Sequence, residues 1–456
     1  MTIQHDPLEG YVRSLCGNVQ NEYTLSEKVY QSDAIERGLR NSDGTGVLAG
    51  VTRIGSVQGY VVQDGERLPM PGKLYYRGID VMDIISAHTR DNTFGYEEVA
   101  YLLLLGHLPT PEQFATFDTV LSKARQLPDG FVEDMIIKAP SRNVMNKLCR
   151  GVMALYSYDE NPDDISIENL MRQSIELIGR FPVIVANAYA VKRHYFDGKS
   201  LYIHKSKEKL SVAENFLRVV RQDKRYSDEE AKLLDLMLIL HAEHGGGNNS
   251  AFVCRAVSSS GTDTYSAIAA AVSSLKGPLH GGANAKVIEM FRYIKENVSN
   301  AKDTAALKDY LVKILDKQAG DCSGKIYGIG HAVYTESDPR AIVLKQYAKT
   351  MAEAKGCLDD FELMEKVEEL GIPLLMERKG MTIPVCANVD MYSGLVYRML
   401  GIPEELYTPL FAIARISGWC AHRIEEVVSG KRIIRPAYKV SFSSRVKREY
   451  KPIDER

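Results

Sequence analysis

Apolar residues recur along most of the chain with the spacing of amphipathic helices, and Gly, Pro, Asn and Asp interrupt the pattern. The pattern predicts helices over residues 79–86, 96–105, 142–156, 165–195 and 228–241. Residues 47–76 are instead rich in β-branched residues and glycine, which predicts a few short strands with a turn at residues 69–72. Strands and helices do not alternate, which argues against a doubly wound sheet. We therefore predict an all-α protein with a few short strands near the N-terminal third.

Composition narrows the class of protein. The chain has 456 residues, enough for two domains or for a large domain with a smaller lobe. A net charge of −2 provides no general field that would attract nucleic acid or an anionic membrane. Seven cysteines without a C-x-x-C pair fit a reducing compartment, and no leader or membrane-spanning window is expected. These features predict a cytoplasmic protein that holds any anionic ligand by local cations.

Residues 277–284, Gly-Pro-Leu-His-Gly-Gly-Ala-Asn, place His280 in a turn directly before an apolar helical pattern. At a helix N-terminus, backbone N–H groups and the helix dipole disfavour a second proton on the ring. A neutral imidazole can donate one hydrogen bond to a carbonyl oxygen, as an electrophile. A purely structural turn residue fits the same loop equally well, so the loop alone does not decide.

Two further histidines, His241 and His244, lie one helical turn apart and precede three glycines. They lack the i, i+4 spacing of an H-E-x-x-H zinc helix, and no third ligand is near in sequence. A structural helix C-terminus and contact with an anion or substrate are the two stronger interpretations. The glycines suit both, as a helix cap and as a close approach of backbone to a ligand.

His331 and Arg340 are nine residues apart around a Ser-Asp-Pro turn, so one loop presents an imidazole and a guanidinium. The planar fork of arginine matches a carboxylate. Asp390 follows in an apolar setting, where desolvation raises the pKa of a carboxyl toward the range useful for proton abstraction. Capping the next helix is a common alternative use of aspartate, and we favour it for this residue taken alone.

Two arginines near the C-terminus are further candidates. Arg415 shares an apolar helical face with Trp419 and His422, where a cation requires an anion from the protein or from a ligand. Arg435 lies in the extended-looking segment Ile-Ile-Arg-Pro. Isolated arginines are usually solvated or salt-bridged, so both depend on context.

In this order, the motifs resemble those of the citrate synthase family. The resemblance covers about residues 47–438. It rests on G-P-L-H-G-G-A-N at 277–284, G-x-G-H-A-V with D-P-R at 328–340, N-V-D-x-Y-S-G at 388–394, F-A-I-A-R-x-x-G-W-x-A-H at 411–422, I-R-P at 434–436, Y-R-G at 76–78 and E-E-V-A-Y-L-L-L-x-G-x-L-P at 97–109.

The resemblance implies an all-α homodimer in which a large domain carries a smaller lobe that closes over the substrates. On this chain it implies an N-terminal arm at 1–46, a large domain at 47–280 and 391–456, and a small lobe at 281–390. Oxaloacetate and an acyl-CoA would be the small-molecule partners, with no nucleic acid and no membrane. No cofactor and no metal is implied, because acetyl-CoA is a substrate.

The resemblance also implies roles for individual residues. Asp390 would remove a methyl proton from acetyl-CoA, His280 would stabilise the enol, and His331 would polarise the ketone of oxaloacetate. Hydrolysis of citryl-CoA would then release citrate and CoA. The oxaloacetate-binding residues of the family fall on His244, His331, Arg340, Arg415 and Arg435, the last reaching the site of the neighbouring subunit.

The loop after His331 departs from the family pattern. Many relatives carry a basic residue there that helps to hold CoA, whereas this chain has Tyr334, Thr335 and Glu336. The remaining candidates for CoA contacts are Gly328, Gly330, Lys325, Arg378 and Lys379.

Three alternative functions remain open from the sequence. A 2-methylcitrate synthase would use propionyl-CoA by the same mechanism, and one methylene in a pocket is worth only about 1–3 kcal/mol. A non-catalytic homologue that binds CoA or a dicarboxylate would need the arginines but not the base Asp390. A metal-dependent hydrolase using His241 and His244 is the weakest alternative.

Overall fold

The computed structural model describes residues 36–41, 44–64, 66–300, 302–438 and 450–455. The chain divides into two units, one formed by Gly50–Ile434 and the other by Met1–Ala49 with Arg435–Arg456. In the second unit, Arg40 pairs with Gly46 across a turn, and the Asn41 side chain donates to Thr45 Oγ1 at 2.6 Å. The predicted arm, residues 1–46, belongs to this unit, and residues 1–35 lie outside the described part.

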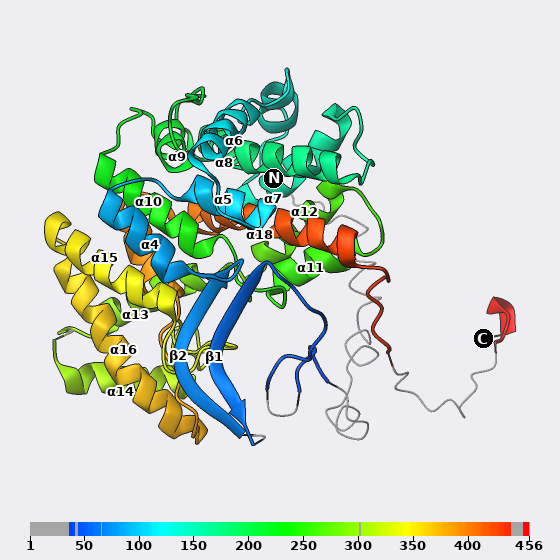
Figure 1. The fold of residues 1–456 in the computed structure, drawn as a ribbon. Coiled ribbons are helices and arrows are strands. Elements are labelled where there is room, and N and C mark those ends of the chain that lie inside the picture. The colour runs from blue at the N-terminus through cyan, green and yellow to red at the C-terminus, as the bar shows by residue number, and fades with distance from the viewer. Residues whose placement is uncertain (1–35, 42–43, 65, 301, 439–449, 456) are drawn as a thin grey trace. The chain divides into compact units, whose positions relative to one another are not determined.

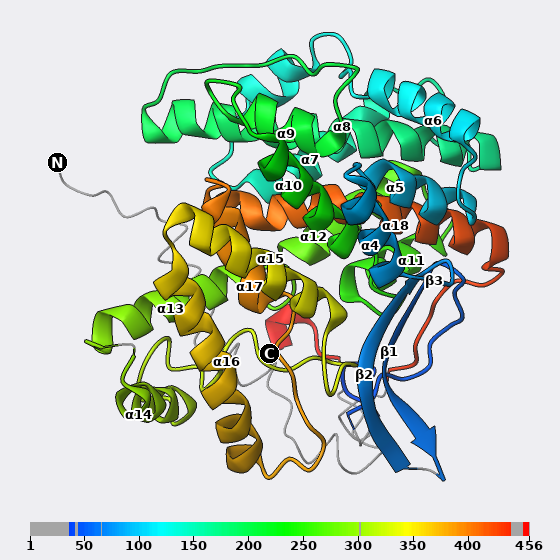
Figure 2. The same ribbon diagram turned by 60° about the vertical axis from the view of Figure 1, so that its left-hand side comes forward.

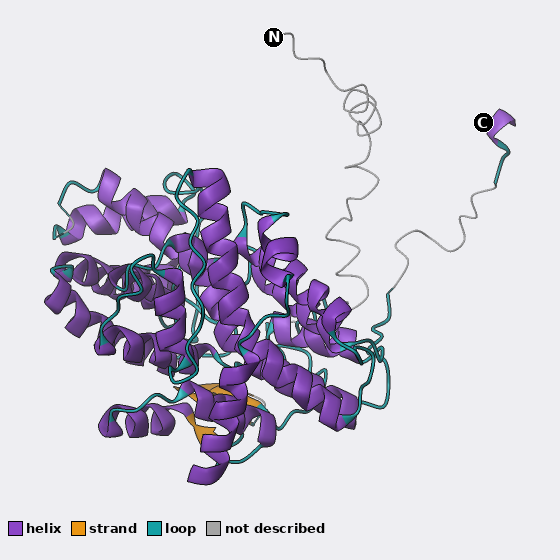
Figure 3. Ribbon diagram, turned by 90° about the horizontal axis from the view of Figure 1, so that it is seen from above, coloured by secondary structure: helices purple, strands orange, loops and turns teal. Residues whose placement is uncertain are grey.

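Helices form most of the unit Gly50–Ile434, and the sheet is confined to one end of it (Figure 3). The predicted all-α class is therefore confirmed. The helices are α4 (Val81–Asp91), α5 (Tyr96–Leu105), α6 (Pro111–Ala124), α7 (Val144–Leu155), α8 (Ile167–Asp197), α9 (Val212–Val220), α10 (Asp228–His241), α11 (Asn249–Ser258), α12 (Thr264–Lys276), α13 (Ala283–Asn297), α14 (Thr304–Leu315), α15 (Pro339–Lys355), α16 (Leu358–Lys379), α17 (Asp390–Met399) and α18 (Tyr407–Ser429). The same unit also contains a π-helix at Val132–Ile137 and 3₁₀ turns at Tyr156–Tyr158 and Glu404–Leu406. The second unit contains a 3₁₀ turn at Ile453–Glu455.

The predicted helices at 96–105 and 228–241 coincide with α5 and α10. Local signals explain such agreement, because Ser227 begins α10 with a capping box in which Glu230 bonds back to the Ser227 backbone. The helix predicted from residue 79 begins two residues later, because Ile79–Asp80 pairs with the preceding strand and Asp80 then caps α4.

One antiparallel sheet contains β1 (Gly55–Gln63), β2 (Glu66–Tyr76) and β3 (Ile79–Asp80), in that order. Figure 1 shows β1 and β2 side by side, and β3 is labelled in Figure 2. The predicted turn at residues 69–72 is wrong, because β2 runs straight through it. The register shifts between Gln58 and Tyr60, opposite residues 70–72 of β2. Pro71 lies in this irregular stretch, where its missing N–H removes nothing from the ladder.

Helix α18 lies among the other helices of the upper part of this unit and packs on α5, α8, α10, α11 and α12 (Figure 2). Most of its length is buried, including Arg415 and Trp419. Helix α8 is long and apolar enough to cross a membrane, but most of its apolar stretch is buried, and it packs on α6, α7, α9 and α18. Its apolar character is thereby explained by packing in the core.

Helices α13, α14, α15, α16 and α17 pack on one another below this group (Figure 2). They contribute the loop of His331, the start of α15 at Arg340 and the start of α17 at Asp390. The division into a large domain and a small lobe at residues 281–390 stays a prediction.

Candidate active site

His280 lies in the turn between α12 and α13, three residues before the first residue of α13, Ala283. The predicted helix start is therefore confirmed. The backbone N–H of Ser250 donates to Nε2 of His280 at 3.3 Å, and Ser250 Oγ is 3.0 Å from the same nitrogen. Because Nε2 accepts the amide hydrogen bond, the proton of the neutral ring is on Nδ1.

The neutrality of His280 has a different cause from the one that the sequence suggested. Burial lowers the pKa of His280 to about 4, and the charge of Arg415 lowers it further. The residue is therefore an uncharged hydrogen-bond donor at pH 7, but desolvation and a neighbouring cation account for it rather than the helix N-terminus.

Two residues behind His280 were given no site role by the sequence analysis. Ser250 is the second residue of α11 and is fully buried. Trp419 on α18 donates from Nε1 to Ser250 Oγ at 3.1 Å. The two helices thus hold the imidazole through one serine, and the available signal was the position of that serine directly after the Gly-Gly-Gly-Asn-Asn run.

The backbone around His331 fixes its ring. The N–H groups of Val333 and Tyr334 both donate to Nδ1 at 3.0 Å, so Nε2 carries the proton of the neutral ring. The Tyr334 ring stacks on the imidazole with centroids 4.4 Å apart, and the His244 ring meets it edge-on at 5.1 Å. The structure therefore brings His244 and His331 together, as predicted for two residues that bind one substrate.

Arg340 is the second residue of α15 and is buried against a carboxylate. Its Nη2 lies 2.7 Å from Asp338 Oδ2 and its Nε lies 3.0 Å from Oδ1. Asp338 Oδ2 also accepts the backbone N–H of Val389 at 3.2 Å. One carboxylate thus ties Arg340 to the residue before Asp390. The sequence analysis gave Asp338 no role, although an Asp-Pro pair is a typical helix start.

Of the three residues that stand where many relatives carry a basic residue, two face inward and Glu336 is exposed. Tyr334 and Thr335 are buried, and Thr335 Oγ1 donates to the carbonyl of Gly59 in β1. A Cβ on Gly59 would lie 2.5 Å from the backbone of Tyr334, so glycine permits this close approach. The loop is therefore held against the hairpin of β1 and β2.

Asp390 is the first residue of α17 and does not cap it. The residue before it, Val389, occupies the cap position, and no side chain makes a capping hydrogen bond there. Asn388 Oδ1 instead accepts the backbone N–H of Asp390 at 3.0 Å. Burial raises the pKa of Asp390 to about 6, against the opposing charge of Arg340. The capping interpretation is therefore wrong, and the carboxyl has the pKa of a general base.

Arg415 is fully buried on α18, where Nε donates to the carbonyl of His241 at 2.7 Å. Phe411 stacks on the His241 ring with centroids 4.4 Å apart and lies under the guanidinium. Nη1 and Nη2 of Arg415 and Nε2 of His244 are buried with no hydrogen-bond partner among the described residues. Unpaired buried donors are costly, so this place is a candidate binding site for an anion.

The charges of this cluster suit a carboxylate. Burial lowers the pKa of Arg415 to about 10, so the guanidinium is still protonated at pH 7. Burial also holds the pKa values of His241 and His244 well below the usual histidine value, with the charges of Arg340 and Arg415 adding to the effect. The cluster therefore presents cationic guanidinium groups beside neutral imidazoles.

The predicted CoA contacts lie in two different settings. Gly330 donates to the carbonyl of Cys386 at 2.8 Å, and Asn388 donates to the carbonyl of Gly328 at 2.8 Å. These bonds join the loop of His331 to the segment before Asp390. Arg378 is exposed at the end of α16 and pairs with Asp316, and Lys325 and Lys379 are exposed. Their contact with CoA stays a prediction.

Arg435 belongs to the second unit and is exposed in a segment without regular structure. Its predicted contribution to a neighbouring subunit stays a prediction. For the metal alternative, the described residues, with the gaps given above, contain no group of three or more His, Cys, Asp and Glu that could hold a metal ion.

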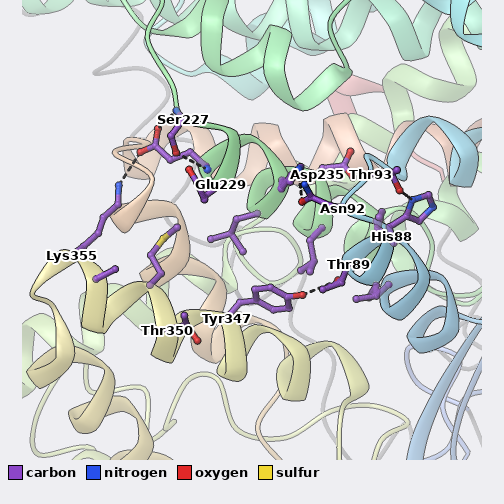
Figure 4. A pocket seen from close by; sticks show the side chains of 18 residues that line it. His88, Thr89, Asn92, Thr93, Ser227, Glu229, Asp235, Tyr347, Thr350 and Lys355 are labelled. Carbon is purple, nitrogen blue, oxygen red and sulfur yellow. Dashed lines mark hydrogen bonds and ion pairs between the residues drawn. The ribbon is translucent and has the colours of Figure 1, made fainter.

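A cavity of about 700 Å³ lies between α4, α10 and α15 and contains none of the predicted site residues (Figure 4). Leu233, Leu236 and Ile239 are among the apolar side chains that line it. At its rim Thr89 Oγ1 bonds Tyr347 Oη at 2.8 Å, and Lys355 pairs with Glu230 at 2.8 Å.

Comparisons with known proteins agree with the geometry. The family model described as "citrate synthase, C-terminal domain" matches residues 42–437. The citrate synthase of Haloferax volcanii is 33% identical over 93% of this chain and 100% of its own length. The 2-methylcitrate synthase of Shewanella oneidensis is 33% identical over 80% of this chain and 88% of its own. The Thermoplasma acidophilum citrate synthase, solved as a ternary complex with carboxymethyl coenzyme A and oxaloacetate, superposes with a TM-score of 0.73 at 28% identity, covering 92% of this chain and 99% of that chain.

Proposed function

Because the chain belongs to the citrate synthase family, we propose that it condenses acetyl-CoA with oxaloacetate and hydrolyses the resulting citryl-CoA to citrate and CoA. The observation that carries the proposal is the pairing of a carboxyl group near neutral pKa, Asp390, with the neutral donor His280. A base and a hydrogen-bond donor of this kind are what removal of a proton beside a thioester carbonyl requires.

In the first step Asp390 takes a proton from the methyl group of acetyl-CoA. Nδ1–H of His280 donates to the thioester oxygen, where negative charge develops as the enol forms. Ser250 holds the opposite ring nitrogen by its backbone N–H, so the donor has a fixed direction. One such preorganised donor is worth about 2.7–4 kcal/mol of transition-state stabilisation.

In the second step the enol carbon attacks the ketone of oxaloacetate. His331, with its proton on Nε2, donates a hydrogen bond to the ketone oxygen and stabilises the negative charge that develops there as the new carbon–carbon bond forms. Arg340 and Arg415 bind the two carboxylates together with His244, and the unpaired Nη atoms of Arg415 support this assignment. Arg435 of a neighbouring subunit completes the site, so the active species is a homodimer.

The remaining elements of the proposal concern CoA and closure. Gly328 and Gly330 line the CoA site, and Lys325, Arg378 and Lys379 are the candidates for its phosphates. The lobe at residues 281–390 closes over both substrates and excludes water until citryl-CoA has formed. The enzyme acts in the cytoplasm and needs no metal or cofactor.

The test is release of free thiol from acetyl-CoA in the presence of oxaloacetate, repeated with propionyl-CoA. We expect kcat/KM to favour acetyl-CoA by about tenfold or more, the range that one methylene can produce. A preference for propionyl-CoA would replace the proposal by 2-methylcitrate synthesis. If the protein binds oxaloacetate but releases no thiol from either acyl-CoA, it is a non-catalytic homologue.

A further inference from the structure

We propose that Glu243 is a positioning residue of the dicarboxylate site, which fixes the turn that carries His244 and offsets the charge of Arg415 until the substrate binds. Glu243 lies between His241 and His244 and is fully buried. The inference rests on the proposed function, because it concerns the binding of oxaloacetate.

The carboxylate of Glu243 closes the turn around His244. Its Oε1 accepts the backbone N–H of Gly245 at 2.6 Å, so the bond spans His244. The same oxygen lies 2.9 Å from Nε2 of His422 on α18. His244 is thus tied to a core helix through its neighbour in sequence.

The hydrogen bonds around His422 place the negative charge on Glu243. Arg255 donates from Nε to Nδ1 of His422 at 3.2 Å, so that nitrogen carries no proton. The ring proton is then on Nε2 and is donated to Glu243. Although burial opposes it, the hydrogen bond from His422 and the charge of Arg415 hold the pKa of Glu243 below its usual value, so the carboxylate keeps its negative charge.

The surrounding backbone makes room for this carboxylate. A Cβ on Gly418 of α18 would lie 2.4 Å from Glu243 Oε2, and a Cβ on Gly55 of β1 would lie 2.7 Å from Glu243 Cγ. Two segments far apart in the sequence therefore approach Glu243 only because they carry glycine there.

The charges of the site give Glu243 its second role. Arg340 is already paired with Asp338, whereas Arg415 has no carboxylate within hydrogen-bond distance among the described residues. Among the charges that act on the pKa of Arg415, Glu243 has the largest effect and raises it against burial. Oε2 of Glu243 has no hydrogen-bond partner in the described part of the chain. The pair is thus balanced in charge but not bonded, which leaves Nη1 and Nη2 for a ligand.

The test compares Glu243→Gln with Glu97→Gln. The amide keeps an acceptor for Gly245 and His422 but removes the charge, so Arg415 is left unbalanced until oxaloacetate binds. We expect a lower Tm without ligand, a larger rise of Tm on addition of oxaloacetate than in the wild type, and a roughly tenfold lower Kd for oxaloacetate. Glu97 is the matched control, because it is also buried beside an arginine, Arg125, in the helical core. Its variant should lose stability but keep the wild-type response to oxaloacetate.

The outcomes separate this inference from the proposed function. If oxaloacetate does not raise the Tm of the wild type, the proposed function itself is contradicted. If the Tm of the wild type rises with oxaloacetate and the rise in Glu243→Gln is equal or smaller, the charge role of Glu243 is overturned.

Glu243→Ala also removes both hydrogen bonds, and we expect its rise of Tm with oxaloacetate to be smaller than that of Glu243→Gln. An equal rise would overturn the turn-fixing role. If Glu243→Gln is not recovered folded, Glu243→Asp keeps the charge but shortens the side chain, so its Kd for oxaloacetate should equal or exceed the wild-type value; a Kd more than about threefold below it would overturn the charge role.

Discussion

The cavity between α4, α10 and α15 and the cluster around His280, His331 and Asp390 differ in the state of their polar groups. At the cavity, Thr89, Tyr347, Glu230 and Lys355 are paired with one another across the rim (Figure 4). In the cluster, the Nη atoms of Arg415 and Nε2 of His244 are buried without partners among the described residues. The polar groups named at the cavity are thus paired, whereas the cluster contains buried polar groups without a partner among the described residues.

In this comparison the predicted site residues coincide with unpaired buried groups and not with the large cavity. Protein interiors pair their buried polar atoms because an unpaired one is costly. A cluster that leaves several atoms unpaired therefore reserves them for a ligand. The following predictions test whether the difference between the two regions is functional.

The largest effect is expected for Asp390, the buried carboxyl group of the cluster, and Asp235, a buried carboxyl group at the cavity, is its control. Asp390→Asn should lower kcat by about 10²–10⁴, because the amide cannot accept the proton of acetyl-CoA. Asp235, which lines the cavity, accepts the backbone N–H of Gly95 at 2.7 Å and has a structural role. Asp235→Asn should lower Tm and leave kcat within about threefold. Thiol release measures kcat, and calorimetry measures Tm. A similar loss of kcat in the two variants would contradict the functional difference between the cluster and the cavity.

The second prediction concerns pH. Because burial raises the pKa of Asp390 to about 6, kcat/KM should fall about tenfold per unit as the pH drops below 6. Protonation of His280 should not contribute until about pH 4. A profile that stays flat to pH 5 would contradict the assignment of Asp390 as the base.

The same carboxyl predicts the sign of a stability effect. A raised pKa means that the folded state keeps a proton that the unfolded chain loses between about pH 4 and 6, so this group lowers stability as the pH rises through that window. Asp390→Asn lacks the titrating group, and its Tm should therefore exceed that of the wild type at pH 7.5 and approach it near pH 4. A Tm difference that does not depend on pH would indicate that the carboxyl titrates normally.

The smallest effect is expected for the apolar wall of the cavity. Leu236→Ala should lower the free energy of unfolding by about 2 kcal/mol, because it enlarges a space that is already present, and it should leave kcat unchanged. Leu236→Met, which keeps the volume, is the matched control. A large change in kcat for the alanine variant alone would show that the cavity takes part in catalysis.

Local sequence signals explain how much of the fold and site could be predicted. The helices α5 and α10 were predicted with their bounds, because capping and glycine signals act within a few residues. The turn of His280 and the helix start at Ala283 follow from the same kind of signal. The predicted turn at residues 69–72 failed, because a register irregularity between β1 and β2 accommodates the prolines inside a strand.

The site residues were found individually, but their partners were not. Ser250, Asp338 and Glu243 hold His280, Arg340 and the turn of His244, and each acts through hydrogen bonds that the local pattern does not reveal. The isolated context of Asp390 favoured a helix cap, and the structure assigns the backbone contact to Asn388 instead.

The sequence by itself determined the helical class, the loops that carry His280, His331 and Asp390, and the family to which those motifs belong, because turns, caps and apolar spacing are encoded over short stretches. Only the tertiary structure decided which imidazoles are neutral, where their protons lie, and which arginine lacks a bonded anion. These properties depend on burial and on partners far away in the chain, since desolvation and hydrogen bonding set protonation and charge.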